Sequence, residues 1–152
     1  MMEEKLYFKN QLEGQSNDEI ILFMYGELVK MLSHVRVYFA ENELGKRVLT
    51  INKAVEVIST LLSILNFEAG QVAFQLKSLY VYSIRNLTKA NFDKDAKLVE
   101  EVQQIFKNLY EAWKEKIARD SEAAAMPGRG KAAAGAVSQR VLTEESKGEW
   151  YG

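Results

Sequence analysis

The spacing of the apolar residues between positions 20 and 117 constrains the fold of this chain more than any other feature. They recur by steps of three and four, which is close to the 3.6-residue repeat of an α-helix and unlike the two-residue repeat of a strand. The clearest stretch is Val48, Ile51, Val55, Ile58, Leu62 and Leu65. The single proline, Pro127, lies beyond this region. The sequence therefore predicts an all-α protein.

Capping and turn residues divide the pattern into four helices. Ser16 can cap the first helix, and Glu19, three residues later, can bond back to the amide of the cap, which is a capping box. Asp93 or Asp95 is placed to cap the fourth helix. The predicted helices end near residues 42–45, 66–70, 91 and 119. Four amphipathic helices joined by short loops are typical of an antiparallel four-helix bundle.

Three segments are expected. Residues 1–15 form a short N-terminal arm, residues 16–119 the bundle, and residues 120–152 an Ala/Gly-rich tail. Such a tail buries too little apolar surface to offset the entropy lost on ordering, so we expect it to be mostly disordered. Its two aromatic residues, Trp150 and Tyr151, are hypothesised to fold back onto the bundle and occupy the groove in place of a binding partner.

Composition and charge exclude several classes of function. The net charge of −1 and the pI near 6.0 lack the basic footprint of a nucleic-acid binder. The chain has no cysteine, which removes disulfides, thiolate zinc sites and thiol nucleophiles. The first residues, MMEEKLYFKN, lack the basic region of a signal peptide, and no apolar run is long enough to span a membrane. These features favour a cytoplasmic protein with no membrane insertion.

Catalytic and metal-binding patterns are also missing. A di-metal bundle needs paired Glu-x-x-His motifs, but the only histidine is His34, and position 31 is Met31. No Ser/His/acid set and no phosphate-binding loop occur at the spacing that their chemistry requires. We therefore expect no enzyme activity, no cofactor and no metal.

Several residues together resemble the FliS family of flagellar secretion chaperones. The third helix of that family typically reads L-x-x-L-Y-x-Y-x-x-R-x-L-x-x-A-N. The N-terminal arm of the family carries a tyrosine, a glutamine and an apolar residue before a helix with L-x-L-Y, and its fourth helix ends in L-x-x-A-W. The matching residues are Leu76, Leu79, Tyr80, Tyr82, Arg85, Leu87, Ala90 and Asn91; Tyr7, Gln11, Leu12, Ser16, Ile20 and Tyr25; and Leu109, Ala112 and Trp113.

The resemblance implies a non-enzymatic binder of flagellin. Such chaperones hold the C-terminal segment of flagellin, which is disordered when free, prevent its premature polymerisation and help deliver it to the type III export apparatus. Export-apparatus or regulatory proteins are possible further partners, and the free chaperone is expected to be a monomer or weak dimer. The candidate partner-binding residues are Tyr7, Gln11, Leu12, Val55, Ile58, Leu62, Tyr80, Tyr82 and Arg85.

The residues themselves favour a docking surface, because the chain has more apolar side chains than a bundle core requires. An exposed apolar surface rimmed by polar groups usually marks a partner site. The residues expected beside the inward stripes are Ile20, Phe23, Phe39, Leu49, Leu61, Phe74 and Val81.

Each candidate also has a structural alternative. Tyr80 and Tyr82 lie about 200° apart around a helix, so one is expected in the core and the other nearer the surface. Val55, Ile58 and Leu62 fit a core as well as a groove, and Arg85 fits an ion pair with a neighbouring helix. A structural module that dimerises through its apolar faces remains the alternative function.

Overall fold

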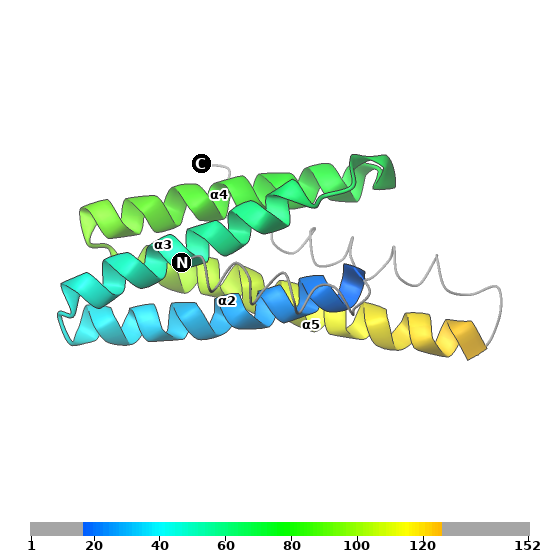
Figure 1. Ribbon diagram of the computed structural model, residues 1–152, viewed down its shortest axis with the longest axis horizontal. Coiled ribbons are helices and arrows are strands. Elements are labelled where there is room, and N and C mark those ends of the chain that lie inside the picture. The colour runs from blue at the N-terminus through cyan, green and yellow to red at the C-terminus, as the bar shows by residue number, and fades with distance from the viewer. Residues whose placement is uncertain (1–16, 126–152) are drawn as a thin grey trace.

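Four α-helices make up most of the part of the chain, residues 17–125, that the computed structural model describes (Figure 1). They are α2 (Asn17–Ala40), α3 (Leu44–Ser63), α4 (Gln71–Asp93) and α5 (Ala96–Ala125), with a short 3-10 turn, η1 (Phe67–Ala69), before α4. Helix α2 packs on α3 and α5, and α4 packs on the same two helices. In Figure 1, α3 crosses from the end of α2 to the start of α4. The predicted all-α, antiparallel four-helix bundle is confirmed.

The same backbone device ends α2 and α4. Asn42 and Lys94 adopt the left-handed conformation, with φ of 55° and 57°. The next residue in each case donates its amide hydrogen to a carbonyl five residues back, from Glu43 to Tyr38 at 2.9 Å and from Asp95 to Ala90 at 3.1 Å. This is the Schellman arrangement, which satisfies carbonyl groups at a helix C-terminus. The tight connections that result hold consecutive helices antiparallel.

Helices α2, α3 and α4 end at Ala40, Ser63 and Asp93, each within about three residues of its predicted end. The predicted cap Ser16 lies outside the described residues. The carboxylate of Asp95 accepts the amide hydrogen of Lys97 at 3.0 Å, so Asp95 caps α5 as one of the two predicted candidates. Helix α5 differs from the prediction because it continues past Arg119 to Ala125. Lys116 and Asp120 pair four residues apart, and alanine is the strongest helix former, so both extend the helix.

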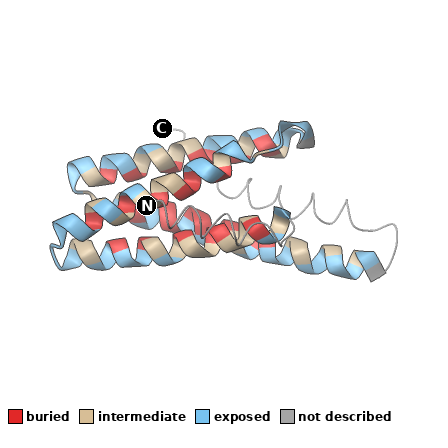
Figure 2. Cartoon of the chain, in the orientation of Figure 1, coloured by how far each residue is buried: buried red, intermediate tan, exposed pale blue. Residues whose placement is uncertain are grey.

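The core is a continuous cluster of apolar side chains from all four helices. Buried residues, coloured red in Figure 2, occur along each of these helices. Its members on α3 differ from those predicted. The structure buries Ala54, Val57 and Leu61 together with Ile51 and Ile58. Four residues predicted to face inward are only half-buried, namely Val48, Val55, Leu62 and Leu65. The buried face of α3 is therefore rotated from the row of its largest apolar residues.

Helices α2 and α5 approach closely along a row of small residues. Gly26, Ser33 and Ala40 are seven residues apart on α2 and therefore lie on nearly one line. A Cβ atom on Gly26 would lie 3.2 Å from the ring of Tyr110 on α5. The buried amide of Gln103 on α5 donates to the Ser33 hydroxyl at 2.7 Å. Small side chains and one satisfied polar group thus fix the pairing of these helices.

Candidate functional site

Tyr80 lies in the core, where its hydroxyl meets that of Tyr25 on α2 at 2.6 Å. Both side chains are almost completely buried. Burial raises the pKa of Tyr25 well above its ordinary value, and the neighbouring Tyr80 raises it further. Burial also raises the pKa of Tyr80, although its hydrogen bond with Tyr25 lowers it. Tyr80 therefore stabilises the bundle from inside, as its structural alternative predicted, and has no exposed surface for a partner.

Other residues of the FliS-like pattern also serve the core. The ring of Trp113 stands edge-on to Tyr25, with the ring centroids 5.6 Å apart. The side-chain oxygen of Asn91 on α4 accepts a hydrogen bond from Arg47 on α3 at 3.4 Å. The guanidinium of Arg47 also lies over the ring of Phe39, 4.8 Å from its centroid. Trp113 and Asn91 of the pattern therefore contribute to how the helices pack.

The three candidates on α3 divide between core and surface. Ile58 is buried in the core, the placement that its structural alternative gave. Val55 and Leu62 are half-buried and pack against the core. With Val48 they form one row at spacing of seven, here called the α3 row. The α3 row borders the buried face of its helix and presents apolar surface outward.

Tyr82, one of the two remaining candidates on α4, faces away from α3. Asn91 shows which side of α4 faces α3, and Ile84, seven residues earlier, lies on that side. Tyr82 is about 200° from Ile84 around the helix. Its hydroxyl instead donates to Glu101 on α5 at 3.3 Å. Tyr82 therefore faces the α5 side, and the structure does not join it to the α3 row.

Arg85 is exposed on α4. Within residues 17–125, no carboxylate lies within ion-pair distance of its guanidinium. The ion pair offered as its structural alternative is therefore not found in this part of the chain. Tyr7, Gln11 and Leu12, the three candidates in the arm, lie outside the described residues, as does the tail from residue 126.

The expected surplus of exposed apolar residues is found in part. Leu49 and Phe74 are exposed, while Phe23, Phe39 and Val81 are half-buried. The expectation is wrong for Ile20 and Leu61, both of which belong to the core. Leu61 is buried because the inward face of α3 is centred near Ala54, seven residues before it, and not on the row of Val55 and Leu62.

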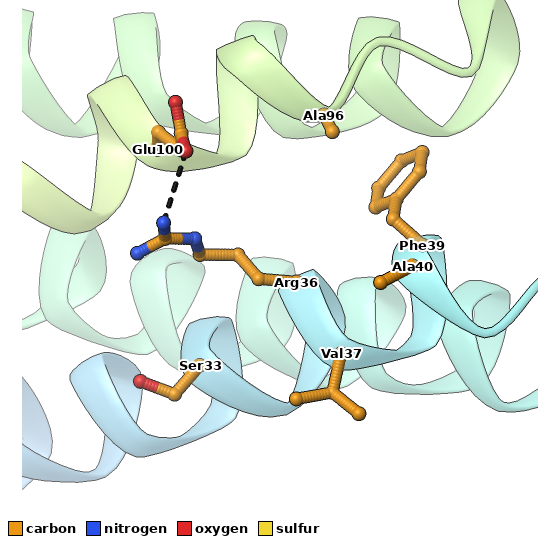
Figure 3. Close-up of a pocket in the computed structure, with 7 residues that line it drawn as sticks. All are labelled: Ser33, Arg36, Val37, Phe39, Ala40, Ala96 and Glu100. Carbon is orange, nitrogen blue, oxygen red and sulfur yellow. Dashed lines mark hydrogen bonds and ion pairs between the residues drawn. The ribbon is translucent and has the colours of Figure 1, made fainter.

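Two surface features escaped the sequence reasoning. Phe67 and Phe74 form an exposed aromatic pair at the start of α4, with ring centroids 4.9 Å apart. A groove of about 590 Å³ lies between the end of α2 and the start of α5 (Figure 3). Val37, which lines this groove, is apolar yet lies off the inward stripe of its helix. An apolar residue outside the inward stripe was the sequence signal from which this groove could have been predicted.

The described residues offer no other type of site. No helix in residues 17–125 is both long enough and apolar enough to cross a bilayer. The same residues contain no group of three or more His, Cys, Asp or Glu side chains arranged to hold a metal ion. What the bundle presents is partly exposed apolar surface on its helices, an arrangement that suits proteins that bind other chains.

Comparison with known proteins identifies the family. The model of the family described as "Flagellar protein FliS" matches residues 2–121. The flagellar secretion chaperone FliS of Campylobacter jejuni is 27% identical over 110 residues, which cover 72% of this chain and 86% of the relative. The flagellar secretion chaperone FliSB of Pseudomonas aeruginosa is 30% identical over 115 residues, which cover 72% of this chain and 90% of the relative. FliS of Salmonella typhimurium is 28% identical over 102 residues, which cover 66% of this chain and 76% of the relative.

The fold and its partly exposed apolar surface are those of an all-α bundle suited to binding another protein chain. Among such bundles, this chain belongs to the FliS family of flagellar secretion chaperones.

Proposed function

We propose that this chain binds the C-terminal segment of flagellin in the bacterial cytosol, keeps it from polymerising and assists its delivery to the flagellar export apparatus. Membership of the FliS family supports this proposal, as does the name "flagellar secretion chaperone" that its relatives carry. This role requires no catalytic groups, only a surface on which a flexible chain becomes ordered.

The observation that carries the proposal is the α3 row. A client that is disordered when free loses entropy on binding, and contacts must offset that cost. Val55 and Leu62 already have one side packed against the core, so they are held in place before a client arrives, and Val48 is half-buried in the same row. Covering their remaining apolar surface stabilises the complex by about 25 cal/mol per Å².

The division of the candidates over two faces favours a client that wraps around the bundle. Val55 and Leu62 would contact one part of the client, and another part would contact Tyr82, which faces α5, and the exposed Arg85. We assign Tyr7, Gln11 and Leu12 to an arm that borders the client surface. Ile58 and Tyr80 then act indirectly, by supporting the helices from within.

The proposal is tested by the stoichiometry of the purified protein with a peptide of the flagellin C-terminal region. Light scattering after size exclusion should give a complex with one copy of each chain. Within that complex the bundle should keep the helix content that it has when free. A tight homodimer that ignores the peptide would instead support the structural module that dimerises through its apolar faces.

A further inference from the structure

The groove between the end of α2 and the start of α5 has the chemistry of a docking site for a short aromatic segment. Val37, Phe39 and Ala40 of α2 and Ala96 of α5 give it an apolar lining. At one side Arg36 reaches across from α2 to Glu100 on α5, with a hydrogen bond of 2.9 Å (Figure 3). Small alanine side chains leave the space open, and Val37 is 47% exposed.

The guanidinium of Arg36 has hydrogen-bond donors that its present partners do not use. One of its terminal nitrogens donates to Glu100 and the other to the side-chain oxygen of Gln103, each at 2.9 Å. A guanidinium has five N–H donors in a planar fork, so further donors remain for another acceptor. The groove therefore combines an apolar lining with an Arg36–Glu100 ion pair at its edge, in which the guanidinium keeps unused donors. Its complement is a segment with adjacent aromatic side chains and a carboxylate.

The chain itself carries such a segment, Glu149-Trp150-Tyr151. The family match ends at residue 121, so this segment lies outside the part shared with the FliS family. Exposed tryptophan and tyrosine side chains gain about 25 cal/mol for each Å² of apolar surface that a groove covers. Glu149 directly precedes the aromatic pair, and its carboxylate is opposite in charge to the guanidinium of Arg36.

The tail is also long enough. From Glu100 to Ala125, α5 covers roughly 38 Å at 1.5 Å per residue. The segment between Ala125 and Trp150 can span up to about 80 Å when extended. The aromatic pair can therefore return from the end of α5 to the groove at its start within the same molecule.

We propose that Trp150 and Tyr151 dock into the α2–α5 groove of their own chain, with Glu149 paired to Arg36. This surface differs from the α3 row, because the groove is lined by α2 and α5 alone. The sequence-based hypothesis placed these aromatic residues where a client would bind. Docking in the α2–α5 groove leaves the α3 row open, and this inference does not depend on the proposed function.

Tryptophan fluorescence tests the docking directly, because the chain has only two tryptophans. The spectrum of the full-length protein minus that of Trp150→Phe isolates the emission of Trp150 without altering the core. Docking predicts emission shifted to the blue of a tryptophan amide in water and a several-fold smaller acrylamide quenching constant. Emission and quenching equal to those of the free amide would overturn the proposal.

Two substitutions locate the docking site. Val37→Glu places a charge in the groove and should shift the Trp150 emission to the red and raise its quenching. Leu49→Glu is the matched control, because Leu49 on α3 is similarly exposed, at 52%, and does not line the groove. Equal responses to both variants would contradict the assignment. A blue shift that disappears on dilution would show a second copy as the occupant and would also overturn it.

Discussion

The hydroxyl groups of Tyr25 and Tyr80 share a hydrogen bond of 2.6 Å across the centre of the bundle, between α2 and α4. These helices are not neighbours in the ring of packed pairs, so the bond ties opposite sides of the bundle together. Phe106 of α5 packs on both rings, with centroid distances of 5.8 and 6.2 Å. The two tyrosines that mark the FliS-like pattern therefore form one buried unit.

Removal of one hydroxyl of this pair should cost more than removal of both. Tyr25→Phe or Tyr80→Phe leaves the other buried hydroxyl without its partner, at a cost of about 1–3 kcal/mol. In the double variant no hydroxyl remains unsatisfied, so its loss of unfolding free energy should be smaller than the loss in either single variant. Urea denaturation of the four proteins measures this coupling. Additive losses would show that the hydroxyl groups act independently.

Alkaline pH should destabilise the bundle through the same pair. The pKa of each tyrosine is raised in the folded state, so the stabilisation is complete below the unfolded pKa of about 10 and decreases as the pH rises above it. Unfolding followed from pH 8 to 11 should show this decrease. The Tyr25→Phe/Tyr80→Phe protein should lose less stability over that range than the wild type. An identical pH dependence of the two proteins would refute this explanation.

Lys116 ties the beginning of α2 to α5. Its ammonium lies 2.6 Å from the carboxylate of Asp18 and 3.4 Å from that of Asp120. Burial lowers the pKa of Lys116, but the two carboxylates more than offset this, and the pKa is raised overall. Lys116→Met should therefore cost about 1 kcal/mol of unfolding free energy, and less at high salt. The measurement is urea denaturation at two salt concentrations, and a loss that grows with salt would contradict the ion pair.

Gly26 is required for the close approach of α2 and α5. Gly26→Leu forces a side chain into the ring of Tyr110 and should destabilise the fold by about 1–3 kcal/mol. Gly45→Leu is the matched control, because no atom lies within 4 Å of a Cβ atom placed there. Thermal unfolding should show a lower Tm for the first variant alone. Addition of Tyr110→Ala should recover part of the loss.

The fold was predictable because its signals are local. Periodic apolar residues, the cap at Asp95 and the turns near Asn42 and Lys94 are each visible within a few residues of sequence. The division of Tyr80 and Tyr82 between core and surface also followed from helical geometry alone. These features require no knowledge of the neighbouring helices.

The rotation of α3 was not predictable by that reasoning. Its largest apolar residues suggest one inward face, but Ala54 is central to the buried face and Arg47 is buried beside it. Arg47 can be buried because its guanidinium donates a hydrogen bond to Asn91 and lies over the ring of Phe39. Both of these residues belong to other helices. Likewise, the α2–α5 groove depends on small side chains from two distant segments.

The central claim is that flagellin covers the α3 row. Isothermal titration calorimetry with a flagellin C-terminal peptide should compare the wild type, Val55→Asp/Leu62→Asp and the control Leu49→Asp, with the Tm of each protein measured alongside. We expect the α3-row variant to bind at least about tenfold more weakly, equivalent to about 1.4 kcal/mol, while the control binds like the wild type. Equal affinity of all three folded proteins, or no binding by the wild type, would contradict the account.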